Sequence, residues 1–183
     1  MAKKADGGLS QMLKVEQYNS IIEAEILTQI LSIVETEINE NERINPLLGF
    51  TDQETVKLDC DNWSCKKTKF WANRALKKYP FLEGYIILKS SKKHYHVVFD
   101  CSVIWADNIS IVGWVAICSN NYEMQKWLSM QCVKKSSTLR VSAKNGVSPR
   151  IVFRFGEQNH QIRDFLKYRR LILKIHSARC SLN

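Results

Sequence analysis

The sequence predicts an α+β fold in which helices pack on an antiparallel sheet. Two patterns favour this class. Short runs rich in β-branched and aromatic residues are typical of strands, and longer stretches with apolar residues every three to four positions are typical of helices. The two kinds of segment alternate along the chain. A length of 183 residues with 45% apolar residues suits one domain with an appendage.

The first 45 residues are expected to stand apart from this domain. Residues 1–14 begin with basic residues and contain no apolar signal region, so they are expected to form a short disordered basic tail. Residues 15–45 are expected to form an acidic amphipathic helical segment, whose helix runs to about Asn41 and is ended by Asn45-Pro46. Its apolar face consists of Ile22, Ile26, Ile30, Ile33, Val34 and Ile38. The main domain is expected over residues 54–178.

Local signals place each element of the main domain in order. Pro80 ends the first helix, a short turn at 90–93 joins two strands, and Asp107 or Asn108 caps the second helix. A turn at 144–146 (Lys-Asn-Gly) joins the last two strands. The expected elements are a strand at about 55–60, a helix over roughly 62–78, strands at 84–89 and 95–101, helices at about 109–116 and 122–128, strands at 138–142 and 150–155, and a helix over about 158–175. This order is that of a ferredoxin-like or RNA-recognition-motif-like core.

The net charge of +9 is distributed unevenly. Residues 15–55 carry nine acids and one base, a net charge of −8, whereas residues 56–183 carry 23 bases and eight acids, a net charge of +15. A domain this basic suits a nucleic-acid backbone, because each neutralised phosphate releases counterions. We therefore expect single-stranded or primed DNA or RNA as a partner. The acidic segment is expected to pack on the domain or to recruit a replication protein.

Location is expected to be cytoplasmic and reducing. No apolar run reaches the roughly 20 residues that cross a bilayer, so no membrane partner is expected. The six cysteines show neither CxxC pairs nor the spacing of a disulfide scaffold. A zinc site from Cys60, Cys65, His94 and His96 has no familiar structural spacing.

Asp59 and Asp61 are the strongest candidates for chemistry. They lie two residues apart at the end of an expected strand, so both carboxylates point to the same face. Carboxylate oxygens are ligands of Mg²⁺ and Mn²⁺, and two of them can share one such cation. The Ser/Lys-rich turn and His96 follow on the next hairpin, where a polyphosphate would find positive charge. An Asp-x-Asp is also a common solvated turn or helix cap.

These motifs resemble those of the archaeo-eukaryotic primase superfamily. Its members carry an apolar strand ending in Asp-x-Asp, a Ser-x-His strand, and an apolar-Asp motif before an Arg-containing strand. Here residues 58–62 fit the first motif, 91–99 fit the second and 138–144 look like the Arg strand. The similarity covers roughly residues 54–155. Where the family places its third carboxylate the chain has Gln131, and Asp100 is the candidate to replace it.

The resemblance implies a nucleotidyltransferase that acts on a single-stranded template in DNA replication. Asp59 and Asp61 would bind Mg²⁺ or Mn²⁺, and with His96 they would form the catalytic group. Nucleoside triphosphates would be bound by Ser91, Lys93, His96, Arg140 and Lys144. The basic C-terminal helix would track the template. The candidates for stacking on its bases are Trp63, Phe70, Trp71 and Tyr95.

Two other readings use the same residues. His94-Tyr95-His96 is similar to the His-hydrophobic-His strand of rolling-circle replication initiators, which bind one metal through two histidines and cut DNA with a tyrosine. Tyr168 would then be the nucleophile, but Asp59 and Asp61 would have no role. Alternatively, Gln131 indicates a primase fold that has lost catalysis and only binds nucleic acid or a replication partner.

Overall fold

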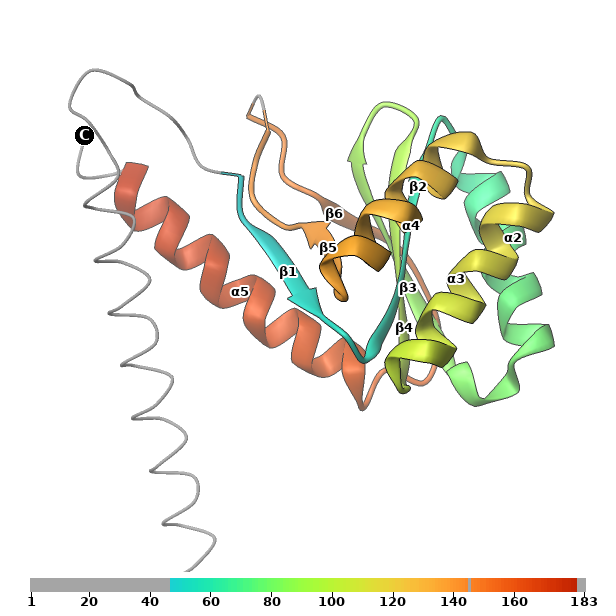
Figure 1. The fold of residues 1–183 in the computed structure, drawn as a ribbon. Helices are drawn as coiled ribbons and strands as arrows, with labels where there is room; N and C mark the ends of the chain where they lie inside the picture. The colour runs from blue at the N-terminus through green and yellow to red at the C-terminus, as the bar shows by residue number, and fades with distance from the viewer. Residues whose placement is uncertain (1–46, 145, 181–183) are drawn as a thin grey trace, which may run out of the picture. The chain divides into compact units, whose positions relative to one another are not determined.

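The computed structural model describes residues 47–144 and 146–180, except the side chains of 175–180. These residues belong to one compact unit, Leu47–Asn183. They form six strands and four α-helices in an α+β arrangement, so the predicted fold class is confirmed (Figure 1). The elements are β1 (Gly49–Asp52), β2 (Thr55–Asp61), α2 (Cys65–Lys78), the 3₁₀ turn η1 (Pro80–Leu82), β3 (Gly84–Ser91), β4 (His94–Ser102), α3 (Trp105–Cys118), α4 (Tyr122–Lys134), β5 (Ser137–Arg140), β6 (Arg150–Gly156) and α5 (Gln161–Cys180).

The main sheet has four antiparallel strands in the order β2-β4-β3-β6. β4 lies at its centre because the tight turn at Lys92-Lys93 pairs it with β3 and its other edge pairs with β2. β1 and β5 form a separate antiparallel ribbon. β3 and β6 approach closely at one end, where a Cβ on Gly84 would lie 2.1 Å from the carbonyl oxygen of Glu157.

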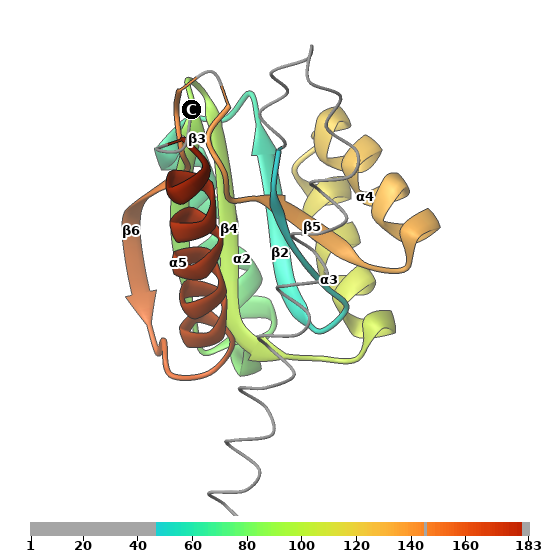
Figure 2. The same cartoon turned by 90° about the vertical axis from the view of Figure 1, so that its left-hand side faces the viewer.

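The two faces of the main sheet are covered by different elements (Figures 1 and 2). One face packs under α2, α3 and α4, around the alternating residues Val56, Leu58 and Cys60 of β2. The other face packs under α5 and the β1–β5 ribbon, in a smaller cluster of Ile86, Leu88, Val98, Leu139, Val141, Ile162 and Phe165. Because strand side chains alternate, Lys57, Asp59 and Asp61 belong to this second face.

Most expected elements are present with shifted ends, but two expectations were wrong. The strands expected at 138–142 and 150–155 do not form a hairpin, because β5 pairs with β1 and β6 pairs with β3. Neither Asp107 nor Asn108 caps α3, which begins at Trp105 after Ile104. Asn108 is buried and its amide donates to the carbonyl oxygens of Gln53 and Thr55. β1 was not expected.

The tail at 1–14, the acidic segment at 15–45 and the partner expected for it lie outside the described residues. Within the described ranges, no helix has the length and apolar character needed to cross a membrane. The side chains of five cysteines are described, and all are free thiols: Cys60, Cys65, Cys101, Cys118 and Cys132.

Candidate functional site

Two acid–histidine pairs lie side by side on β2 and β4. The register places Asp59 opposite His96 and Asp61 opposite His94. The two aspartates are two residues apart on β2 and the two histidines are two residues apart on β4. All four side chains therefore share the face under α5 and the β1–β5 ribbon. The structure therefore brings together the three residues expected to be catalytic, and adds His94.

The inner pair, Asp59 and His96, is largely desolvated. The Asp59 carboxylate is 24% exposed and the His96 ring 6%, and Asp59 Oδ1 lies 3.7 Å from His96 Nε2, beyond hydrogen-bond distance. Burial, with a further contribution from the Asp61 charge, raises the pKa of Asp59 to about 7. Burial, reinforced by Arg140, lowers the pKa of His96 to about 3. Both groups are therefore neutral at slightly acidic pH.

The outer pair, Asp61 and His94, is more exposed and directly bonded. His94 Nδ1 and Asp61 Oδ1 are 2.5 Å apart, and both side chains are a little over one-third exposed. The carboxylate holds one ring nitrogen of His94 and so fixes the orientation of the ring. This arrangement presents a carboxylate and an imidazole to solvent at the end of the sheet.

Arg140 brings a positive charge to the inner pair. Its guanidinium donates to the carbonyl oxygens of Ser142, Val147 and Ser90 at 2.6–3.2 Å, which ties the loop after β5 to the end of β3. Its charge opposes the rise in the pKa of Asp59 and contributes to the lowering of the pKa of His96.

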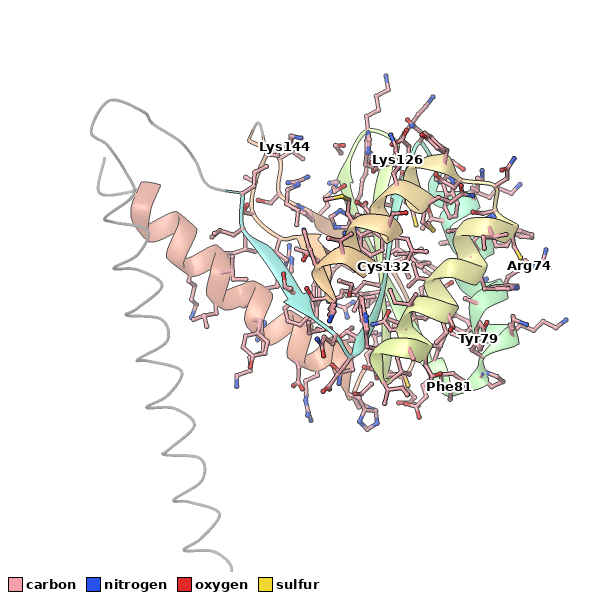
Figure 3. The ribbon with its side chains drawn as sticks, viewed as in Figure 1. Arg74, Tyr79, Phe81, Lys126, Cys132 and Lys144 are labelled. Atoms are coloured by element: carbon pink, nitrogen blue, oxygen red, sulfur yellow. The ribbon has the colours of Figure 1, made fainter. Side chains whose placement is uncertain are left out.

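The other expected nucleotide contacts surround this end of the sheet less closely. Ser91 is the register partner of His94. Lys93 is an exposed turn residue with a φ of 61°, and its carbonyl oxygen accepts from the Trp63 amide. Lys144 is exposed on the loop after β5 (Figure 3), and no described contact joins it to the carboxylates.

Neither candidate for the third ligand is available to the pair of aspartates. Asp100 is fully buried, and its carboxylate accepts from the backbone amides of Asn159, His160 and Ile162, so it anchors the start of α5. It lies four residues along β4 from His96, about 13 Å away. Gln131 is also buried: its amide nitrogen donates to the Trp127 carbonyl and its amide oxygen accepts from the Thr138 amide. Both side chains stabilise the fold.

The carboxylates of Asp59 and Asp61 suit a cation that also keeps water or substrate phosphates as ligands. In the described part of the chain, no group of three or more His, Cys, Asp or Glu side chains is arranged to hold a metal ion. Mg²⁺ is commonly bound by one or two carboxylates together with water and substrate phosphates. Asp59 and Asp61 fit that role, because burial and then the charge of Asp61 raise the pKa of Asp59, and a divalent charge between the carboxylates would offset both effects.

The residues of the alternative readings are placed apart from this site. Tyr168 packs against Phe50, with ring centroids 5.9 Å apart, and lines a groove of ≈540 Å³ between β1 and α5. Apart from Tyr168, that groove contains none of the candidate site residues. Cys60 points to the opposite face from the histidines, so the four zinc candidates do not converge. Of the expected base-stacking aromatics, Trp63, Trp71 and Tyr95 are buried in the core and Phe70 is half exposed.

Sequence reasoning assigned no role to His94 beside the aspartates, although the two-residue spacing from His96 was a usable signal. It also missed Lys57, which is fully buried on the same face with Nζ 3.1 Å from Asp52 Oδ1. This contact is an ion pair without hydrogen-bond geometry. Burial lowers the pKa of Lys57 to about 8.

Comparison with known proteins adds no family to these observations. No protein-family model, no curated protein and no solved structure matches the chain.

Proposed function

We propose that this chain is a metal-dependent nucleotidyltransferase with a primase-like palm, acting on a single-stranded template in DNA replication. The observation that carries the proposal is the pairing of Asp59 and Asp61 on β2 with His96 and His94 on β4. The two carboxylates share one face and influence each other electrostatically, as ligands of one divalent cation do. We further propose a cytoplasmic, reducing location.

The strand order supports an RNA-recognition-motif-like core. In such a core the first strand pairs with the third, and the third with the second. Here β2, β3 and β4 have that arrangement, with α2 between the first two. β5, in the position of the fourth strand, pairs instead with β1, the segment just before β2. β6 extends the opposite edge.

The proposed mechanism assigns separate tasks to the two pairs. Mg²⁺ or Mn²⁺ held by Asp59 and Asp61 would supply charge that stabilises the attacking and leaving oxygens. His96 stays neutral because of its burial, so it is suited to donate or accept a hydrogen bond with a phosphate oxygen. Arg140 supplies positive charge beside Asp59. Ser91, Lys93 and Lys144 are the proposed outer contacts to a nucleoside triphosphate.

A primer-extension assay tests the proposal. The full-length protein is incubated with a single-stranded template, with and without primer, labelled ribo- or deoxynucleotides, and Mn²⁺ or Mg²⁺. We expect incorporation that is lost in Asp59→Asn and Asp61→Asn and retained in Asp107→Asn, an exposed carboxylate in the first turn of α3. Full activity in Asp59→Asn/Asp61→Asn would refute the proposed site.

A second candidate function is a primase fold that binds nucleic acid without catalysis. The observation in its favour is the structural use of both Asp100 and Gln131, which leaves the two aspartates without a third acidic partner among the described residues. No incorporation under any metal, together with salt-sensitive binding of single strands, would select this candidate. A covalent DNA adduct that is lost in Tyr168→Phe would instead support strand nicking.

A further inference from the structure

Helix α2 carries an unusual concentration of positive charge. Its 14 residues contain no acid and six bases: Lys66, Lys67, Lys69, Arg74, Lys77 and Lys78. None of these six forms an ion pair with a carboxylate in the described part of the chain. The surface of α2 is therefore a stripe of positive charge about 21 Å long that no carboxylate of the described residues neutralises.

Toward the N-terminus this charge works against the stability of the helix, whereas Lys77 and Lys78 lie in the last turn, where the helix dipole favours cations. Lys66 and Lys67 lie in the first turn, where the helix dipole disfavours cations, and no acidic residue is present there. Lys66 and Lys69 are three residues apart, as are Arg74 and Lys77, and like charges at this spacing repel each other. Cation–π contacts within the fold offset part of this cost: Lys67 lies over Trp63, Lys69 over Phe153, Arg74 over Trp71 and Lys78 over Trp114. A polyanion bound along the helix would offset the repulsion that remains.

One exposed aromatic ring lies among these bases, and a second lies on the neighbouring strand β6. Phe70 is 53% exposed on the ridge between Lys66 and Arg74, and the Arg74 guanidinium lies 5.7 Å from its ring centroid. Phe155 on β6 is 47% exposed and stacks on Tyr85, whose hydroxyl donates to Asn73 of α2 at 2.7 Å. Half-exposed rings flanked by cations suit unpaired nucleic-acid bases, because every base offers a face for stacking and every nucleotide a phosphate.

The position of α2 connects this surface with the candidate site. α2 covers the face of the sheet opposite to the aspartates, and its N-terminus follows Asp61 after three residues. The same end of the sheet carries the hairpin turn, where the Trp63 amide donates to the carbonyl oxygen of Lys93. A strand lying along α2 would thus run toward the end of the sheet where Asp61 and His94 are exposed.

We propose that the α2 surface, defined by Lys66, Lys69, Phe70, Arg74 and Phe155, binds single-stranded DNA. Phosphates lie against the bases and at least one unpaired base stacks on Phe70. The binding uses neither the carboxylates nor a metal. This surface gives a location to the single-stranded template of the proposed nucleotidyl transfer, and its binding can be measured without that reaction.

The test is fluorescence anisotropy of labelled oligothymidine with the full-length protein, in EDTA and without nucleotides, over a series of salt concentrations. Phe70→Ala is expected to weaken binding about tenfold with no change in salt dependence, and Phe70→Trp to restore it. Lys66→Ala/Arg74→Ala is expected to reduce the slope of log affinity against log salt by about 1.4, because each single-strand phosphate contact contributes about 0.7.

A matched control comes from α4. Lys126→Ala/Lys134→Ala removes two exposed bases with the same eight-residue spacing, and is expected to leave the slope unchanged (Arg74 and Lys126 are labelled in Figure 3). Equal weakening by the two double variants would overturn the proposal, since only net charge would then matter. A neutral Phe70→Ala, or duplex DNA bound as tightly as the single strand, would overturn the assignment to single strands. Binding of the single strand without any primer extension would refute only the proposed catalysis.

Discussion

Removing either member of the inner pair should reveal opposite pH dependences of stability. The pKa of Asp59 is raised to about 7 in the fold, so its contribution to stability falls as pH rises from about 4 to 7. The pKa of His96 is lowered to about 3, so its contribution falls as pH drops from about 6.5 to 3. Between about pH 4.5 and 6 the pair carries one proton in the folded protein, on Asp59, and one in the unfolded protein, on His96. The two effects therefore cancel in the wild type. Each contribution to the free energy of unfolding changes by at most about 1.4 kcal/mol per pH unit.

Urea denaturation followed by tryptophan fluorescence, at several values between pH 4.5 and 6, measures the effect. The stability of Asp59→Asn minus that of the wild type should rise with pH, because the variant lacks the Asp59 contribution. The same difference for His96→Gln should fall with pH. Over 1.5 pH units each difference should change by up to about 2 kcal/mol. Two flat differences, or two of the same sign, would refute the buried neutral pair.

Three further predictions concern the framework around the site. Lys57→Met should be at least as stable as the wild type at pH 7, whereas Asp52→Ala should cost about 3 kcal/mol or more in denaturation experiments, because it leaves a buried ammonium without its partner. Asp100→Ala should cost at least about 1–2 kcal/mol and increase amide hydrogen exchange at the start of α5, where it removes the acceptor of three amides. Gly84→Ala should lower the melting temperature, because its Cβ would meet the Glu157 carbonyl oxygen at 2.1 Å.

Local sequence patterns predicted the centre of the sheet because its strands are apolar runs joined by short turns. β3 and β4 follow from such runs around the turn at 92–93. The turn at 144–146 was equally typical of a hairpin, but a turn reverses the chain without selecting a strand partner. β5 pairs with β1, a four-residue strand that contains Gly49 and carries little strand signal of its own.

The site was predictable to the same extent. Alternation along β2 places Asp59 and Asp61 on one face, and alternation along β4 does the same for His94 and His96, so the sequence alone provides that information. That these two faces coincide depends on the strand register. The bond between His94 and Asp61 depends on the exact register of two strands that are 33 residues apart. The role of Asp100 depends on the approach of α5, which begins 61 residues later, so an unassigned carboxylate beside the motif could not be recognised as an anchor.

The depth of the four side chains indicates from which side a ligand reaches them. His96 and Asp59 lie toward the middle of the sheet, with buried Lys57 and Val98 beyond them, so that direction is closed. Asp61 and His94 lie at the strand ends and are the most exposed of the four. The segment from Asp61 to the first turn of α2 and the 92–93 turn surround this opening. A polyanion held on α2 and a cation held by the aspartates would therefore meet at the same end of the sheet. The binding and extension assays measure these two halves separately, since one needs no metal and the other depends on it.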